Sequence, residues 1–315
     1  DSARAMQLPL LSSLETLRGS GFDRTHALAI GGYEDGSGDV FYANARDVAG
    51  DLTRRGMSTA IIQWSDWVDG QWTVPFTHYD ALTVGDVDGD GLDELIIAQD
   101  EDSKIRIIEP LGAEIGHFYS AFTPFDALEA GDVDGDGRDE IIVARNLGES
   151  FGVLTVYRGD GTFVADVPVP FREWDDMDVG DVLGDGWAEG EWIDDRGREE
   201  IVLISERDDR VRIYRLTDLN HLVQAGSGGW TASVNFTRKD RMRVGNVRSE
   251  WPRDEIVVVR DDDQTIYIYD GLGTWLARLG RDVDGDGKTD TRYTPYDGFE
   301  LADLDRDLLA DGQFV

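Results

Sequence analysis

The sequence predicts an all-β fold, a β-propeller built from four-stranded antiparallel blades. Short runs in which β-branched and aromatic residues alternate recur about four times in each period of roughly 50 residues. No long segment with a helical period competes with them. A carboxylate-rich loop of fixed spacing recurs beside the strands. We therefore expect one propeller domain that covers residues 1–315.

Six related segments mark the expected blade starts. The clearest two are Gly85–Glu94 and Gly131–Glu140, each followed by an apolar run and separated by 46 residues (131 − 85). The last start lies 13 residues before the C-terminus (315 − 302), so that blade needs strands from elsewhere, and residues 1–25 are expected to close it. This predicts six blades, or seven if the N-terminal segment holds a degenerate one. The starts lie near residues 31, 85, 131, 180, 245 and 302.

Charge restricts the classes of partner. The chain carries 65 acidic and 30 basic residues, a net charge of −35, which disfavours nucleic acid and anionic membranes and attracts divalent cations. Acidic excess with only three lysines favours a salt-adapted organism. The absence of cysteine excludes disulfides and thiolate metal sites. No stretch approaches the roughly 20 apolar residues of a membrane span. We expect an extracellular or cell-surface protein. The N-terminus has no signal-peptide pattern, so any export signal has been removed already or lies outside this chain.

The recurring loops have the ligand spacing of a calcium site. Carboxylates at positions 1, 3 and 5 converge on one point when a glycine at position 6 allows a tight turn, and a carbonyl at position 7 and a carboxylate at position 9 complete an oxygen shell. Hard oxygen ligands in this number suit calcium, and magnesium is the weaker candidate. The last ligand at position 9 and the strand that follows distinguish these loops from EF-hands. The predicted ligands of the first two loops are Asp86, Asp88, Asp90, the Leu92 carbonyl and Glu94, and Asp132, Asp134, Asp136, the Arg138 carbonyl and Glu140.

Two further loops bring the expected number of calcium sites to about four. The third lies outside the register of the blade starts, and the fourth keeps the spacing but has Leu308 where glycine is preferred. The loops that begin at Asp181 and Asn246 and the first blade start have lost ligands, and we expect these three to be free of metal. The ligands of the third and fourth loops are Asp282, Asp284, Asp286, the Lys288 carbonyl and Asp290, and Asp303, Asp305, Asp307, the Leu309 carbonyl and Asp311.

The segments GDVDGDGLDELIIA and GDVDGDGRDEIIVA resemble the FG-GAP (VCBS-type) repeats of the integrin α-subunit propeller and of many secreted bacterial and archaeal proteins. The resemblance extends from about His26 to Val315, specific in two repeats and looser in the rest. It implies a propeller whose calcium loops join the first and second strands of a blade. It also implies ligands at the opposite face or in grooves between blades. The family includes adhesion modules, lectins and domains attached to lyases, so the resemblance does not identify a function.

No catalytic constellation is recognisable, and an enzyme is the less favoured reading. The four histidines have neither triad nor zinc-ligand spacing. Tryptophans 187, 192, 230 and 251 lie on expected loops, where packing is favoured over stacking on sugars. An aspartate precedes five of the starts by five residues, and we expect each to cap a turn, with a ligand or cation rim as the alternative. These are Asp80, Asp126, Asp175, Asp240 and Asp297.

Three functions therefore stay open. The leading hypothesis is an extracellular, non-enzymatic binding, adhesion or scaffold module that presents a propeller face to a protein or glycan, with calcium in a structural role. The second is a lectin or a polysaccharide-active enzyme domain, in which tryptophans and acidic side chains line a cleft. The third is a self-assembling unit of a surface layer or filament.

Overall fold

The computed structural model describes residues 26–32, 38–44, 59–63, 71–75, 80–109, 113–148, 151–183, 186–188, 191–193, 198–218, 220–225, 229–232, 235–247, 253–263, 265–279, 301–302 and 313–314. These residues form β-strands and turns, and none of them is helical. Within this described part no helix is long and apolar enough to cross a membrane. The chain divides into two compact units. One comprises Asp1–Val84, Leu92–Pro124 and Tyr296–Gly298, and the other comprises Gly85–Gly91, Phe125–Pro295 and Phe299–Val315.

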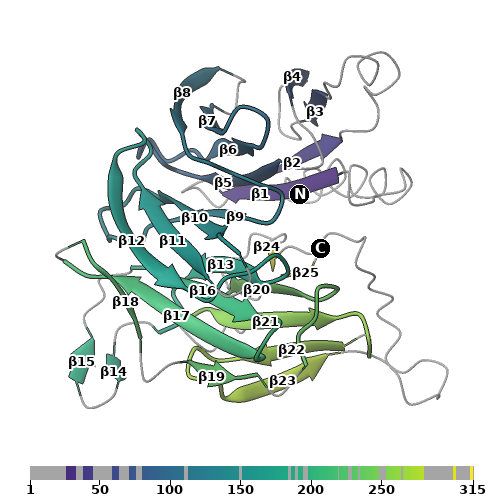
Figure 1. Ribbon diagram of the computed structural model, residues 1–315, viewed down its shortest axis with the longest axis vertical. Helices are drawn as coiled ribbons and strands as arrows, with labels where there is room; N and C mark the ends of the chain where they lie inside the picture. The colour runs from purple at the N-terminus through teal and green to yellow at the C-terminus, as the bar shows by residue number, and fades with distance from the viewer. Residues whose placement is uncertain are drawn as a thin grey trace, which may run out of the picture. The chain divides into compact units, whose positions relative to one another are not determined.

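The first unit contains two four-stranded antiparallel sheets, apart from Gly85 at the end of β5 (Figure 1). Their strands pair in chain order, β1-β2-β3-β4 and β5-β6-β7-β8. The bounds are β1 His26–Gly32, β2 Gly38–Asn44, β3 Thr59–Gln63, β4 Gln71–Pro75, β5 Ala81–Gly85, β6 Glu94–Gln99, β7 Lys104–Ile108 and β8 Glu114–Tyr119.

The second unit contains two four-stranded sheets, one five-stranded sheet and two short pairs. The sheets are β9–β12, β20–β23, and β13-β16-β17-β18 with β19 paired to β17, and the pairs are β14–β15 and β24–β25. Their bounds are β9 Ala127–Gly131, β10 Glu140–Asn146, β11 Gly152–Tyr157, β12 Phe163–Val169, β13 Asp176–Gly180, β14 Gly186–Ala188, β15 Glu191–Ile193, β16 Glu200–Ser205, β17 Arg210–Leu216, β18 Leu222–Gln224, β19 Trp230–Thr231, β20 Arg241–Gly245, β21 Glu255–Arg260, β22 Thr265–Tyr269, β23 Trp275–Leu279, β24 Leu301–Ala302 and β25 Gln313–Phe314.

Wherever burial is described, the second strand of a four- or five-stranded sheet forms the centre of the core. Strands β6 and β16 are buried at every residue, which explains their continuous apolar runs, whereas the outer strands β8 and β23 are largely exposed. In the second unit the apolar clusters lie between neighbouring sheets. One joins Ile142 and Leu154 to Ile201 and Tyr214, and another continues into the sheet β20–β23. Burial between the faces of successive sheets is the packing expected of propeller blades.

All six predicted starts correspond to strands. Residues 31, 85, 131, 180, 245 and 302 lie in β1, β5, β9, β13, β20 and β24, and their assignment as blade starts of one domain stays a prediction. The insertion after the start at 180 forms the β14–β15 pair. The expected closing role of residues 1–25 lies outside the described residues, and β24 pairs with β25 near the C-terminus.

Candidate metal loops and blade interfaces

The first carboxylate of each intact loop organises the backbone around it. Asp86 accepts three backbone N–H groups, from Gly89 at 2.7 Å and Asp90 at 3.1 Å on Oδ1, and from Gly91 at 2.9 Å on Oδ2. Gly89 and Gly91 have φ of 80° and 85°, a left-handed backbone that favours glycine. Asp132 accepts the equivalent three bonds at 2.7, 3.1 and 2.9 Å. The two loops therefore share one tight conformation.

The carboxylates at positions 1, 3 and 5 converge in both loops. One oxygen each from Asp86, Asp88 and Asp90 lies within 4.8 Å of the others, and the same holds for the second loop. In the second loop burial, followed by the charge of Asp136, raises the pKa of Asp134. Three like charges at this separation repel one another, and a hard divalent cation would offset that repulsion. The donor set therefore fits calcium at these three positions.

The glutamate at position 9 has a contact that does not require a metal. Glu94, Glu140, Glu200 and Glu255 are 0–2% exposed. Oε2 of Glu140 accepts the N–H of Asp134 at 3.2 Å, and burial, followed by the charge of Asp134, raises the pKa of Glu140 to about 8. Glu200 and Glu255 also accept a backbone N–H from their own loops, from Leu183 at 2.9 Å and from Val247 at 3.0 Å, although those loops have lost ligands. A metal-binding role for Glu94 and Glu140 stays a prediction.

The remaining predicted ligands stay predictions or lie outside the described residues. The carbonyls of Leu92 and Arg138 remain predictions. The third and fourth loops, residues 282–290 and 303–311, lie outside the described residues.

The acidic residue immediately before the glutamate that opens a sheet's second strand, which sequence reasoning missed, bonds to the first position of the preceding loop. Asp139 donates its N–H to the carbonyl of Asp86 at 2.9 Å, and its Oδ2 accepts the N–H of Asp86 at 2.8 Å. Glu199 makes the same two bonds to Asp132, both at 3.0 Å, and Asp254 makes them to Asp181, both at 2.9 Å. We call these three residues the clamp carboxylates. Each fixes the first position of a loop from the sheet that follows.

Burial of the clamp carboxylates affects both their charge and their neighbours. It raises the pKa of Asp139 to about 6 and that of Glu199 to about 8. A Cβ at Gly85 would lie 2.6 Å from Oδ2 of Asp139, and one at Gly180 would lie 2.6 Å from Oδ2 of Asp254. These start positions are therefore glycine because a carboxylate of the next sheet occupies the space. A sequence signal for the clamps exists in the recurring triplet of arginine, an acid and glutamate at 138–140, 198–200 and 253–255.

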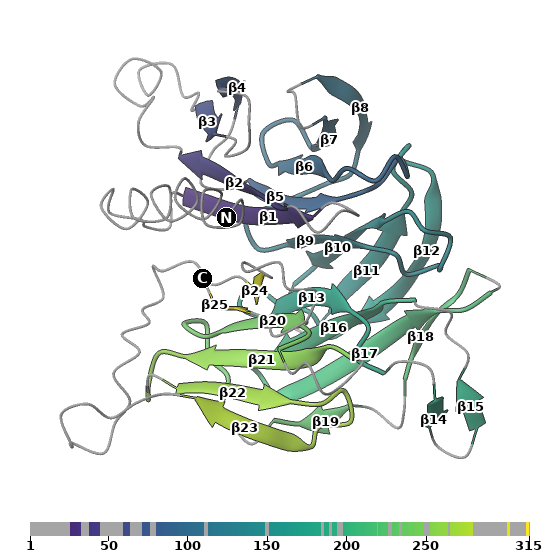
Figure 2. The ribbon, with the colours of Figure 1, turned by 180° about the vertical axis from the view of Figure 1, so that it is seen from behind.

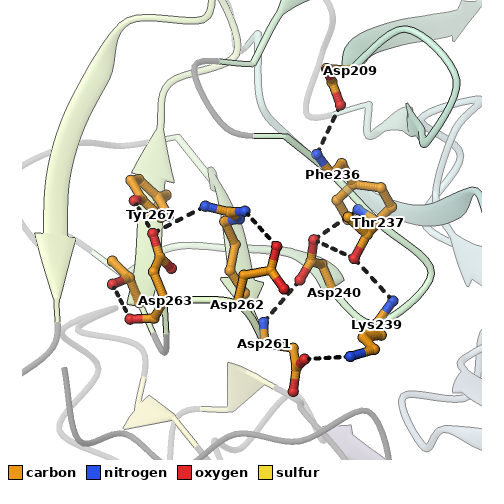
Figure 3. Close-up of polar contacts among 11 residues, drawn as sticks. Asp209, Phe236, Thr237, Lys239, Asp240, Asp261, Asp262, Asp263 and Tyr267 are labelled. Atoms are coloured by element: carbon orange, nitrogen blue, oxygen red, sulfur yellow. Dashed lines mark hydrogen bonds and ion pairs between the residues drawn. The ribbon is translucent and has the colours of Figure 1, made fainter. Parts of the chain in front are cut away.

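The aspartates before the starts cap turns, as the sequence predicted. Oδ1 of Asp80, Asp126, Asp175 and Asp240 accepts an N–H from the last residue of the second strand or from the residue that follows it, at 2.7–2.9 Å. Figure 3 shows the Asp240 example, in which the second oxygen also accepts the N–H and the hydroxyl of Thr237 at 2.8 and 3.1 Å. Asp240 is buried, so it does not form an exposed ligand rim. Asp297 lies outside the described residues.

Histidines and tryptophans show no catalytic arrangement among the described residues. Nδ1 of the half-exposed His117 lies 2.8 Å from Oε1 of Glu114. Trp230 in β19 donates Nε1–H to the carbonyl of Gly271 at 3.2 Å, and its ring lies 5.2 Å from that of Tyr269, so it packs beside β22 and β23 (Figure 2). Trp187 and Trp192 are cross-strand partners in the β14–β15 pair. Trp251 and His78 lie outside the described residues.

Comparison with known proteins agrees with the repeat prediction. Residues 86–143 match the model of the FG-GAP-like repeat. No curated protein sequence matches the chain significantly.

Solved structures show likeness at the level of fold. An Agrocybe aegerita lectin, described for its specific recognition of non-reducing terminal N-acetylglucosamine, is 13% identical, with 92% of this chain and 74% of the lectin covered and a TM-score of 0.54. Regucalcin of Agrobacterium tumefaciens, described as a calcium-binding protein, is 12% identical over 81% of this chain and 75% of that chain, with a TM-score of 0.44. The expected resemblance and the propeller fold are confirmed.

Proposed function

We propose that this β-propeller with an FG-GAP-like repeat is a calcium-stabilised, extracellular binding module without catalytic activity. The observation that carries the proposal is the shared geometry of the loops at 86 and 132, where three carboxylates converge on a backbone held by the first of them. When bound, calcium would supply positive charge at the centre of that cluster and would stabilise the loop.

The proposed role of the metal is structural, because the aspartates that would bind it also hold the backbone of their loops. Asp86 and Asp132 hold the loops by accepting backbone N–H groups with their side chains, while their own main chains bond to Asp139 and Glu199 of the following sheet. A cation that binds these aspartates would therefore also stabilise their backbone contacts with Asp139 and Glu199. Ligand binding to the folded state alone contributes about 2.7 kcal/mol per site when the free ligand is at 100 times its dissociation constant.

Chelation tests the proposal directly. The melting temperature should fall by several degrees or more in EDTA at moderate salt and return with added calcium, whereas added magnesium should restore less. The double variant Asp88→Asn, Asp134→Asn should lose most of this response. The matched control Asp181→Asn changes a loop expected to be free of metal and should keep it. An identical melting curve with and without EDTA would contradict the proposal.

A glycan is the favoured ligand class if the module binds a small molecule. Phe125 and Trp174 are 42% and 43% exposed and precede the recurring aspartate at equivalent positions of two sheets of the second unit. The Cζ of Arg238 lies 5.7 Å from the Trp174 ring centroid. Exposed aromatic faces stack on sugar rings, and a lectin shares this fold. A glycan array should detect binding that Trp174→Ala removes. If no glycan on the array binds, the glycan proposal is wrong and the ligand is a protein or a second copy of this chain. Sedimentation of the chain in calcium would distinguish these two, because only self-assembly raises the mass of the pure protein.

A further inference from the structure

Two equivalent turns of the second unit lie beside each other. The turn 172–175 precedes β13 and the turn 237–240 precedes β20. In each turn the N–H of the last residue donates to the carbonyl of the first, at 3.1 and 2.8 Å. The two strands are in direct contact, because Oδ2 of Asp176 in β13 accepts the N–H of Met242 in β20 at 2.9 Å. The turns therefore occupy neighbouring positions on adjacent sheets.

One exposed side chain from each turn makes the contact between them. Cζ of Arg238 lies 5.7 Å from the ring centroid of Trp174. Trp174 is 43% exposed, and Arg238 is exposed as well. A guanidinium beside an aromatic ring is held by its charge, and its five N–H donors are not all directed at one ring. The ring therefore positions the guanidinium and leaves donors open to a ligand.

Two guanidinium groups of the second turn carry charges that no ion pair with a described residue neutralises. This is unusual in a chain with 65 acidic and 30 basic residues. Arg241 donates from Nη1 to the carbonyl of Asp240 at 2.7 Å, and Arg238 contacts Trp174. The carboxylate of Glu206 accepts the backbone N–H of Arg238 at 3.3 Å and does not pair with the guanidinium. The turn therefore presents positive charge next to an exposed aromatic ring.

We propose that the turns 172–175 and 237–240 bind an acidic glycan, with Trp174 stacking on a sugar ring and Arg238 pairing with its carboxylate or sulfate group. The inference rests on the proposed glycan binding and names the class of glycan. An aromatic ring accepts many sugars, whereas a guanidinium pairs with anionic groups through charge-assisted hydrogen bonds, so Arg238 determines the preference. The net charge of −35 opposes an acidic ligand mainly at long range, because charges more than about 8 Å apart are largely screened at about 0.15 M salt.

Calorimetric titration of the full chain in calcium at about 0.15 M salt tests this with an oligogalacturonate, the methyl ester of the same oligosaccharide and a sulfated galactose oligosaccharide. At least one acidic oligosaccharide should bind about fivefold more tightly than the uncharged ester, the gain expected from one exposed ion pair. The tighter of the two acidic probes identifies the anionic group. Arg238→Gln should remove the preference, and Arg238→Lys should keep part of it. Glu206→Gln, which removes a nearby negative charge, should strengthen binding of the acidic probe and leave the ester unchanged.

Arg215→Gln is the matched control, because it removes an arginine near the end of β17 that lies away from the turn containing Glu206. The inference is overturned if neither acidic probe binds more tightly than the ester, or if Arg215→Gln lowers the preference as much as Arg238→Gln does. Binding of the ester that Trp174→Ala removes would then still support the proposed glycan binding. An absence of binding to all three probes and to the glycan array would overturn both. Melting curves of the variants distinguish lost binding from impaired folding.

Discussion

Replacement of Gly180 by alanine should disrupt a blade interface without touching a predicted metal ligand. The added Cβ would lie 2.5 Å from Cγ1 of Val244 and 2.6 Å from Oδ2 of Asp254, closer than such atoms approach in folded proteins. Relief of this crowding costs about 1–3 kcal/mol for overpacking. Displacement of Asp254 from the N–H of Asp181 adds about 1.5–3 kcal/mol for a lost bond to a charged group. Together this gives a loss of about 2.5–6 kcal/mol.

Denaturant unfolding, followed by circular dichroism in EDTA, measures this loss as a lower midpoint. Gly116→Ala is the control, because a Cβ there would meet only Cδ1 of Ile107 at 3.9 Å and the midpoint should stay constant or rise slightly. Asp254→Ala should be destabilising alone but should reduce the further cost of Gly180→Ala, since one of the two crowding groups is gone. A loss below about 1 kcal/mol for Gly180→Ala, or equal costs with and without Asp254, would refute the clamp geometry.

Two further predictions concern single side chains. Burial raises the pKa of Asp175 from 3.8 to about 6, so the folded chain holds this proton more tightly than the unfolded chain does. The contribution of Asp175 to stability is therefore greatest below pH 4 and declines as the pH rises to about 6. Relative to the parent, Asp175→Asn should become more stable across this window, and a pH-independent difference between the two melting curves would contradict the assignment. Trp230→Phe removes the hydrogen bond to the Gly271 carbonyl and should lower the free energy of unfolding by about 1 kcal/mol, measured by thermal unfolding. Any glycan affinity should stay unchanged. Loss of glycan binding with an unchanged melting curve would contradict the packing role of Trp230.

Much of the fold follows from local pattern. A Gly-Asp pair after a short strand and an apolar run after the loop repeat often enough to place the first strands correctly, even where the loop has lost ligands, as at Asp181 and Asn246. The turn-capping aspartates could also be predicted, because Asp126 and its partner Asn146 are only 20 residues apart and recur in one register.

The clamp carboxylates show where local pattern is insufficient. Asp139 bonds to Asp86 across 53 residues, Glu199 to Asp132 across 67 and Asp254 to Asp181 across 73. In the sequence, an acidic residue directly before a glutamate looks like one more charge in an acidic turn. Its importance comes from burial against the preceding sheet, which only the packed structure shows.

The sequence by itself determined the positions of the first strands, the four-stranded repeats and the carboxylate spacing of the loops, because these depend on residues close together in the chain. Only the tertiary structure showed which acidic residues bond to the first position of a preceding loop and that Arg158 lies beside the second loop. Arg158 is separated from the second loop by two strands, and hairpin pairing returns it to Glu140, where its Nη2 lies 2.9 Å from Oδ2 of Asp134. Charge acts through space, so a residue that is distant in the sequence changes the charge around the loop.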